Sequence, residues 1–288
     1  MGQKLTFGVV IRPQHWLWAD QISEWAKAEE IGFESIWLND HFHSLGHTID
    51  NPAFEASTTL AALAMSTSKV KIGVLTYGNT HRNPAILFKQ IVTVDQMSGG
   101  RVIFGIGTGW HESEHAAYGV HLPSAGDRVR MLEETLEMFR QSETNDRTTF
   151  HGRYYSLEDA PFWPKPVNGR IPILIGGTKP KMLRVIGRNA DIWDSSMAVD
   201  EYTTALRTIR GHAREAGRDP AAIMGSANVW EGPISDKEFA DRVRAYHKAG
   251  ARQMLVKYTP DRKGVETFPH LMTEIVPELR AELDRQDE

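Results

Sequence analysis

Short apolar runs alternate with longer amphipathic stretches along most of the chain. The runs have the length of β-strands, and most are rich in Val and Ile. Near-continuous apolar runs are typical of strands covered on both faces, as in a parallel sheet. The eight predicted strands span residues 5–11, 35–38, 70–76, 102–106, 171–175, 190–193, 223–229 and 253–257. Because a helical stretch follows most of them, the pattern predicts a (β/α)8 TIM barrel.

The junctions between these elements support the barrel. Predicted helices end in glycine just before a strand in residues 31–33, 98–101 and 249–251, and glycine suits the left-handed turn after a helix. Ser235 and Glu238 have the spacing of a capping box at a helix start. We therefore expect helices and strands to alternate through most of the chain.

One stretch breaks this alternation. Residues 141–170 are rich in proline and aromatic side chains and do not fit one regular helix. We interpret them as an insertion before the fifth strand, with a small hairpin at residues 149–155. Since α/β barrels of roughly 250 residues fold as one domain, residues 1–288 are expected to form a single domain.

Composition and charge exclude several classes of function. The chain has no cysteine, so disulfides, thiolate metal sites and a cysteine nucleophile are excluded. The formal net charge is −4 with no basic run, so no nucleic-acid partner is expected. No segment approaches the roughly 20 apolar residues of a membrane span, and the first residues lack the features of a signal peptide. We therefore expect a cytoplasmic protein.

Candidate chemistry gathers where the predicted strands end, which is where TIM barrels build their active sites. The polar and aromatic residues just past the strands are Arg12, Gln14, His15, Trp16, Asn39, Asp40, His41, His43, Thr76, Tyr77, Asn79, Trp110, Trp193, Asp194, Ser195, Trp230, Glu231, Lys257 and Tyr258. A wide aromatic mouth suits a planar organic ligand better than a small sugar or a metal ion.

Two glycine-rich loops follow predicted strands. Gly176, Gly177 and Thr178 precede a helix that begins near Pro180, and a phosphate group can approach glycine backbone at a helix N-terminus. A tight strand-to-helix turn explains the same glycines equally well. Residues 105–109 lack the GxGxxG spacing of a dinucleotide fingerprint. They form either a crowded barrel turn or backbone that packs against a flat ligand.

Asp40, His41 and His43 follow the second predicted strand. A histidine at this point can donate a proton, because its ordinary pKa lies near neutrality. Alternatively, His41 is a structural histidine bonded to Asp40, or the two histidines bind a metal as in barrel hydrolases. No metal is expected, because later strands do not offer the further ligands such a site needs. Glu112 and Glu231 are the carboxylate pair that a glycosidase would require, and they leave the glycine loops unexplained.

Several segments, in order, resemble the bacterial luciferase-like family of flavin- and deazaflavin-dependent oxidoreductases. The matching segments are residues 35–42, 81–120, 126–140, 150–160 and 171–194. The most specific features are the Asn-Pro-Ala helix start at residue 83, the SGGR turn at residue 98 and the GTGW loop at residue 107. The resemblance becomes general beyond residue 194.

The resemblance implies a cofactor across the barrel mouth, with its ring near strands two to four and its phosphate at strand five. His41 resembles the family histidine beside the reactive ring, and Asp40 would position it. A non-prolyl cis peptide behind the ring would fall near Val74 and Leu75. The implied cofactor-binding residues are Val74, Leu75, Thr76, Gly107, Thr108, Gly109, Gly176, Gly177 and Thr178.

The resemblance favours F420 as the cofactor, because residues 81–194 are closer to the deazaflavin members. Cations near the expected phosphate would also suit its oligoglutamate tail. These cations are Lys165, Lys179, Lys181, Arg184 and Arg188. The expected function is hydride transfer between F420 and a small organic substrate. The alternative is an FMN-dependent monooxygenase that uses oxygen, and the rival classes are a metal-dependent barrel hydrolase and a cofactor-binding protein without turnover.

Two further expectations concern substrate and assembly. The glucose-6-phosphate dehydrogenases of the deazaflavin branch have a Trp shortly after the histidine and an acidic residue after the GTG. Leu45 and Trp110 stand at those positions here, so that sugar phosphate is not the expected substrate. The apolar, alanine-rich helices at residues 54–65 and 84–97 lie on the side through which family members commonly pair, so a homodimer is expected.

Overall fold

The computed structural model describes residues 3–45, 50–258 and 263–287. Within these ranges, eight parallel strands pair side by side into a closed ring in the order β1-β2-β3-β5-β8-β9-β10-β11. Their bounds are β1 Thr6–Val10, β2 Ser35–Leu38, β3 Lys71–Val74, β5 Val102–Gly107, β8 Ile173–Gly176, β9 Ile192–Ser195, β10 Met224–Trp230 and β11 Ala251–Lys257. The closed ring confirms the predicted TIM barrel.

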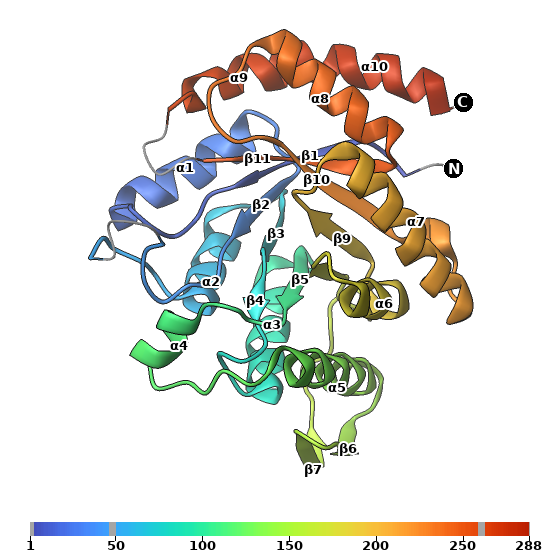
Figure 1. The fold of residues 1–288 in the computed structure, drawn as a ribbon. Coiled ribbons are helices and arrows are strands. Elements are labelled where there is room, and N and C mark those ends of the chain that lie inside the picture. Colours follow the sequence, from blue (N-terminus) through green and yellow to red (C-terminus); the bar gives the residue numbers. More distant parts are fainter. Residues whose placement is uncertain (1–2, 46–49, 259–262, 288) are drawn as a thin grey trace.

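Helices surround the strands (Figure 1). The longer ones are α1 Trp18–Glu30, α2 Ala56–Ser66, α3 Pro84–Ser98, α5 Ala125–Thr144, α6 Pro180–Asn189, α7 Val199–Glu215, α8 Asp236–Lys248 and α10 Val276–Asp287. Short turns complete the set, namely α4 Glu112–Ala117, α9 Phe268–His270, η1 Pro220–Ala222, η2 Val265–Thr267 and η3 Leu271–Ile275. Among the described helices, none combines the length and apolar character that crossing a bilayer requires.

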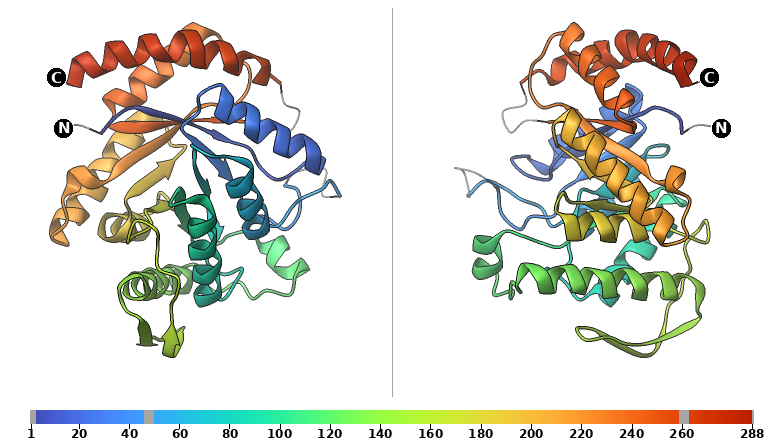
Figure 2. Two further views of the ribbon diagram at one scale, coloured as in Figure 1. Left: turned by 180° about the vertical axis from the view of Figure 1, so that it is seen from behind. Right: turned by 45° about the vertical axis from the view of Figure 1, so that its right-hand side comes forward.

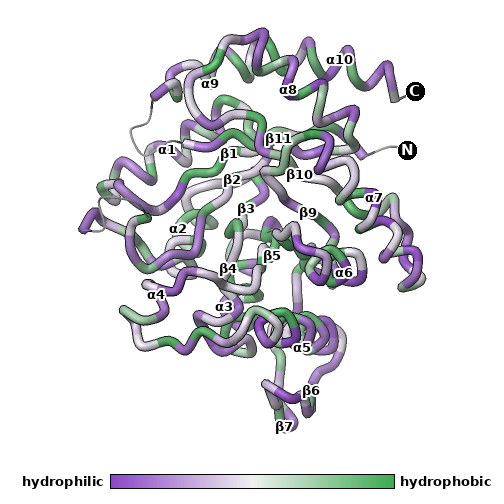
Figure 3. Tube along the Cα trace, viewed as in Figure 1, coloured by the Kyte–Doolittle hydropathy of each residue, from purple (hydrophilic) through white to green (hydrophobic). Residues whose placement is uncertain are grey.

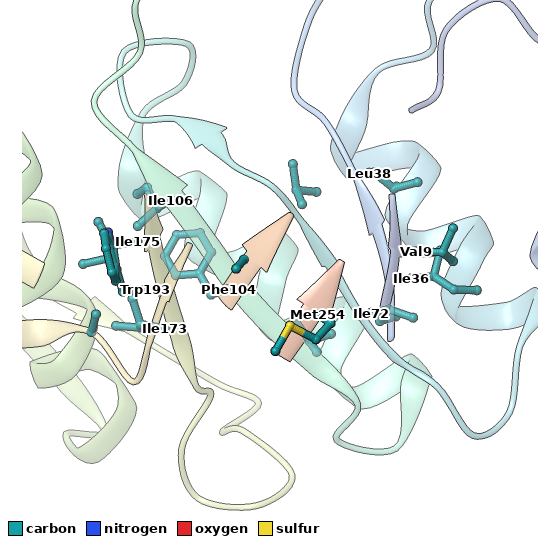
Figure 4. Packing of buried hydrophobic residues seen from close by; sticks show 14 of the residues in the cluster. Val9, Ile36, Leu38, Ile72, Phe104, Ile106, Ile173, Ile175, Trp193 and Met254 are labelled. Atoms are coloured by element: carbon teal, nitrogen blue, oxygen red, sulfur yellow. The ribbon is translucent and has the colours of Figure 1, made fainter. Parts of the chain in front are cut away.

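The barrel core has two layers because neighbouring strand residues point to opposite faces. The larger layer lies between strands and helices and includes the labelled Val9, Ile36, Phe104 and Ile175 in Figure 4. A smaller cluster fills the barrel interior and consists mainly of the strand residues that point inward. Its members are Val10, Trp37, Ile103, Leu174, Ile192 and Leu255. Hydrophilic positions recur along outer helices such as α8 and α10 (Figure 3).

The insertion before the fifth barrel strand is shorter than predicted. Helix α5 continues to Thr144, because Glu143 in its last turn accepts a hydrogen bond from the backbone N–H of Ile171 at 2.8 Å. The antiparallel hairpin β6 (Arg147–His151) and β7 (Ser156–Pro161) follows. It is longer than the expected hairpin at residues 149–155. The right-hand view of Figure 2 shows that it projects beyond α5.

The third predicted strand is interrupted where it reaches the barrel mouth. Strand β3 ends at Val74, and the two-residue strand β4 (Tyr77–Gly78) pairs further along β5. The bond between Leu75 and Thr76 is a non-prolyl cis peptide, one position beyond the expected Val74–Leu75 bond. A side chain at Gly105 would overlap the carbonyl oxygen of Val74. The glycine of β5 therefore permits this close approach of two strands.

Candidate active site

A cavity of about 150 Å³ lies at the C-terminal ends of β2, β3, β4 and β5. Its lining residues are Asp40, His41, Leu75, Thr76, Tyr77, Gly78, His81, Gly109, Trp110, His111 and Glu114. The structure thus brings together five of the predicted site residues, which are Asp40, His41, Leu75, Thr76 and Gly109. Gly107 lies directly behind this cavity, because a Cβ there would be 2.7 Å from the Thr76 hydroxyl oxygen.

Glu114 on the short helix α4 holds the ring of His41. Its carboxylate is fully buried and lies 3.0 Å from His41 Nδ1, and it also accepts the backbone N–H of Phe42. Burial opposes ionisation, but the hydrogen bonds from His41 and Phe42 outweigh it and lower the pKa of Glu114. An ionised carboxylate accepts only, so His41 Nδ1 carries the proton and donates. The Nε2 atom is then the ring nitrogen left for chemistry.

Asp40 does not position His41, contrary to the prediction. Its carboxylate accepts two hydrogen bonds from Arg82, at 2.8 and 2.7 Å, one from the amide of Gly78 at 2.9 Å, and one from His81 Nδ1 at 3.0 Å. Burial raises the pKa of Asp40, but the bonds from His81 and Arg82 dominate and lower it to about 2. Asp40 and His41 follow the end of β2 and, although adjacent, have different partners.

His81 lies between these two carboxylates. Its Nδ1 faces Asp40, and its Nε2 is 3.9 Å from Glu114 Oε2. The Nε2 atom is buried and has no hydrogen-bond partner among the described residues. Side chains from the loop after β2, from α4 and from the loop before α3 therefore form one buried charged network. We use that term for Arg82, Asp40, His81, Glu114 and His41.

Arg82 ties the charged network to the barrel wall. It also pairs with Glu55, the N-cap residue of α2. Burial lowers the pKa of Arg82, but hydrogen bonding and attraction to Asp40 and Glu55 outweigh this and raise it. Sequence reasoning did not single out Arg82, His81 or the role of Glu114. The signal available was the proximity of the HRNP and HESEH segments to the predicted strand ends.

Aromatic rings form one wall of the cavity. Trp110 is 63% exposed and meets His41 edge to face, with ring centroids 5.9 Å apart. His111 lies 4.7 Å from Trp110 and 5.4 Å from His43, again centroid to centroid. His43 is absent from the cavity lining, and its Nδ1 contacts the carbonyl of Ser44 at 2.9 Å. In the part of the chain that the structure describes, no three His, Cys, Asp or Glu residues are arranged to hold a metal.

The predicted phosphate site lies at the turn between β8 and α6. We call residues 176–178 the glycine turn. Helix α6 starts at Pro180, and its N-cap residue Lys179 makes no side-chain hydrogen bond to the first amides. Gly177 has φ +140°, and Trp193 Nε1 donates to its carbonyl at 2.9 Å. The turn is thus fixed by backbone geometry, with α6 amides that no N-cap side chain satisfies.

The predicted cluster of cations around this turn is smaller than expected. Lys179, Lys181, Arg184 and Arg188 are exposed. Lys165 instead donates to the carbonyls of Ser142, at 3.0 Å, and Asn145 at the end of α5. It is therefore engaged with that helix end rather than available to a phosphate or its tail.

The opposite side of the mouth carries further polar groups. Asp194 at the end of β9 accepts a hydrogen bond from Ser226 at 2.8 Å, and burial raises the pKa of its carboxyl group. Arg12 and Glu231 form a weak ion pair at 3.8 Å. Glu231 and Glu112 are absent from the lining of the cavity beside His41. The carboxylate pair that a glycosidase would need is therefore not assembled there.

Comparisons with known proteins agree with this architecture. The model of the luciferase-like monooxygenase family matches residues 6–232. An F420-dependent glucose-6-phosphate dehydrogenase of Kineococcus radiotolerans is 34% identical over 201 residues, covering 68% of this chain and 59% of that protein. A 5,10-methylenetetrahydromethanopterin reductase of Methanolobus tindarius is 27% identical, covering 88% of this chain and 74% of that protein. The chain spans little more than half the length of the first curated relatives it matches, between 50% and 59%.

Solved structures share the fold across almost the whole chain. An F420-dependent secondary alcohol dehydrogenase in complex with an F420-acetone adduct has a TM-score of 0.85 at 22% identity, covering 96% of this chain and 99% of that one. A riboflavin lyase with modified FMN and riboflavin has a TM-score of 0.82 at 16% identity, covering 97% and 92%. With the family match over residues 6–232, these findings show that the chain belongs to the luciferase-like monooxygenase family.

Proposed function

We propose that this chain is an F420-dependent oxidoreductase that transfers a hydride between the deazaflavin and a small organic substrate. The observation that carries the proposal is the His41–Glu114 pair in the cavity at the barrel mouth. The names of the dehydrogenase and reductase relatives support the same cofactor. F420 supplies a ring carbon that accepts or donates a hydride, and the protein must handle the accompanying proton.

His41 is the group that handles this proton. With Nδ1–H donated to Glu114, the neutral ring presents a lone pair at Nε2. When a substrate alcohol loses a hydride from carbon, its hydroxyl proton moves to His41 Nε2 and a carbonyl remains. In the reverse direction the imidazolium returns the proton to the carbonyl oxygen. The buried carboxylate of Glu114 stabilises the positive ring in both directions.

The surrounding backbone fits a flat ring and a phosphate group. Val74, Leu75 and Thr76 would lie behind the ring, where the chain passes close to Gly105 and Gly107. Thr108 and Gly109 would border its edge. The amides of Gly176, Gly177 and Thr178 would hold the phosphate near the start of α6, where helix N–H groups favour an anion. This assignment uses the residues that β5 and β8 bring to the mouth.

The substrate is a small organic molecule other than glucose 6-phosphate. The relatives that bear that sugar phosphate in their names cover between 57% and 74% of this chain, so the resemblance to them is partial. Trp110 stands directly after Gly109 and forms an aromatic wall beside His41. An indole at this position suits an apolar substrate surface. The acidic residue that the glucose-6-phosphate dehydrogenases have at this position would instead suit a substrate with hydroxyl donors.

The test is titration of the apo-protein with F420 and with FMN, followed by an assay without oxygen. We expect F420 to bind, and reduced F420 to reduce a ketone, an activated alkene or an imine. Tight FMN binding with strict oxygen dependence, and no F420 binding, would support an FMN-dependent monooxygenase instead. Loss of activity on chelation would support the metal-hydrolase alternative.

We also propose that the chain forms a homodimer through α2 and α3. Three large apolar side chains on these helices remain exposed, namely Met65 at 67%, Ile86 at 58% and Met97 at 42%. Contact with a second copy would remove this apolar surface from water. Light scattering at micromolar protein should give twice the monomer mass, and Ile86→Glu should lower it. A monomeric mass for the unmodified protein would contradict the proposal.

A further inference from the structure

A second cavity lies at the opposite end of the barrel from His41. It has a volume of about 330 Å³ and borders the N-terminal ends of β10 and β11. Its lining residues are Gln3, Arg210, Arg214, Pro220, Ala221, Gly250 and Arg252. Three of these residues are arginines, and no carboxylate lines the cavity. The proposed hydride transfer at the other end of the barrel makes no use of this site.

Arg210 and Arg214 bring two like charges together beside this cavity. Arg210 and Arg214 are four residues apart on α7, and like charges at that spacing destabilise a helix. Their side chains form no hydrogen bond or ion pair with any other described residue. Burial, together with repulsion from Arg252, lowers the pKa of Arg210 despite attraction to Tyr202. The Nε atom of Arg210 is buried without a hydrogen-bond partner, and such a group costs free energy.

Other arginines on this side of the barrel have carboxylate partners. Arg170 pairs with Asp191 at 2.6 Å, and Arg218 lies 3.6 Å from the same carboxylate. Arg280 pairs with Glu34. Each of these guanidinium groups thus has a carboxylate beside it, whereas none lines the cavity beside Arg210 and Arg214.

Arg252 is held in place beside the cavity by backbone carbonyls. Its guanidinium donates to the carbonyls of His247 at 3.1 Å and Ala251 at 2.9 Å. These bonds fix the side chain at the end of α8, next to the cavity. A fixed guanidinium loses little conformational entropy when an anion binds, and its planar donor set matches phosphate oxygens.

We propose that this cavity binds the phosphate group of a small metabolite through Arg210, Arg214 and Arg252. Three guanidinium groups suit a multiply charged tetrahedral anion better than a single carboxylate. The volume of about 330 Å³ lies at the lower end of the range for small-molecule sites. The site is separate from the glycine turn, because it borders strand starts rather than strand ends.

The test measures thermal unfolding with inorganic pyrophosphate at constant ionic strength and saturating F420, which occupies the cofactor site. Pyrophosphate should raise Tm by roughly 3–10 °C at ten to a hundred times its Kd. Arg210→Met should abolish this shift and leave Tm in plain buffer unchanged or higher. Arg214→Met should weaken pyrophosphate binding at least tenfold. Arg207→Met is the matched control, since it removes an exposed arginine of α7 that is absent from the cavity lining, and it should retain the shift.

Three results would overturn the proposal. The first is no pyrophosphate shift in the unmodified protein, and the second is an equal shift in the Arg210→Met and Arg207→Met variants. The third is a lower Tm of Arg210→Met in plain buffer with no anion effect, because the arginines would then serve only the helix C-termini. Succinate is the comparison ligand, and an equal shift with succinate would remove the preference for phosphate. A larger Tm shift with a nucleoside diphosphate than with pyrophosphate would indicate that the cavity also binds the organic part of a phosphorylated metabolite.

Discussion

The two sides of the barrel mouth are built on different principles. The charged network consists of side chains from distant segments that fix one another by hydrogen bonds and ion pairs. The glycine turn at residues 176–178 relies on backbone, with Gly177 at φ +140° and its carbonyl held by Trp193. A proton-transferring group needs a defined protonation state, whereas a phosphate needs donors that never titrate. Under the proposed function, each side of the mouth would meet a different chemical requirement.

The two sides of the mouth also differ in how they affect the stability of the fold. Asp40 and Glu114 are fully buried carboxylates, and a buried ion that loses its partner is costly. The glycine turn contains no buried charge, and its cost is the conformational freedom that glycine loses on folding. Changes in the charged network should thus alter both stability and catalysis, while changes in the turn should alter cofactor binding.

The largest effect is expected from His41→Ala. Loss of the group that exchanges the proton should lower turnover by roughly 10²–10⁴-fold. The Kd for F420 should change little, because the proposed phosphate site lies at the glycine turn. His43→Ala is the matched control, since His43 is absent from the cavity lining, and its turnover should stay within a few-fold of the unmodified protein. Steady-state kinetics with normal turnover in His41→Ala would remove this residue from the mechanism.

Arg82→Met should be the most destabilising change in the charged network. It leaves the buried carboxylate of Asp40 without its bidentate partner, which should cost about 3–5 kcal/mol of unfolding free energy. Adding Asp40→Asn should restore part of the loss, because no unpaired charge remains. The control is Arg147→Met, whose ion pair with Asp159 is exposed on both sides and should contribute little to the free energy of unfolding. Equal losses in urea unfolding for both arginines would contradict the distinction.

Glu114→Gln should impair the proton-transfer step without removing the side chain. One carboxylate oxygen accepts the amide of Phe42, so the glutamine NH₂ would face His41 Nδ1 and move the ring proton to Nε2. Turnover should fall roughly 10–100-fold, by analogy with groups that orient reactive ligands. Nitrogen-15 NMR of labelled histidine measures the tautomer directly, and a merely structural role for Glu114 would leave it unchanged.

The charged network should also set the acid limit of folding. The pKa of Asp40 is lowered to about 2 from the ordinary 3.8, so its contribution to stability is complete above pH 4 and is lost as pH falls toward 2. The contribution is of the order of 2 kcal/mol. Asp40→Asn should therefore flatten the decline of unfolding free energy between pH 4 and pH 2. An identical acid profile in the variant would assign that decline to other carboxylates.

Much of the fold could be predicted because each barrel strand leaves a recognisable apolar pattern in the local sequence. The apolar run at residues 35–38 coincides with β2, since a strand buried on both faces leaves its pattern in neighbouring residues. The break after Val74 could not be predicted, because it depends on the close approach of Gly105 from another strand. The extension of α5 to Thr144 likewise depends on a contact between Glu143 and Ile171.

The site was predicted only in part for the same reason. His41 and the glycine turn follow strands, so the barrel geometry alone brings them to the mouth. The partners in the charged network are separated by 73 residues for His41 and Glu114 and by 41 residues for Asp40 and His81. Adjacency suggested that Asp40 would hold His41, but the partners of Asp40 come from residues 78–82. Partner identity is a tertiary property that local spacing does not contain.

The smallest effect, and the sharpest test of the backbone side of the mouth, is expected from Gly176→Ala. A Cβ at Gly176 would meet no protein atom closer than 3.8 Å, so the free energy of unfolding should be unchanged. If the phosphate packs against this backbone, the added methyl group should raise the Kd for F420 about tenfold, or roughly 1.4 kcal/mol. Gly177→Ala is the comparison, because φ +140° strains any side chain there and should lower stability as well as affinity. Unchanged F420 affinity in Gly176→Ala, measured by fluorescence titration, would place the phosphate away from the glycine turn, and the mouth would then lose its division into a titrating side and a backbone side.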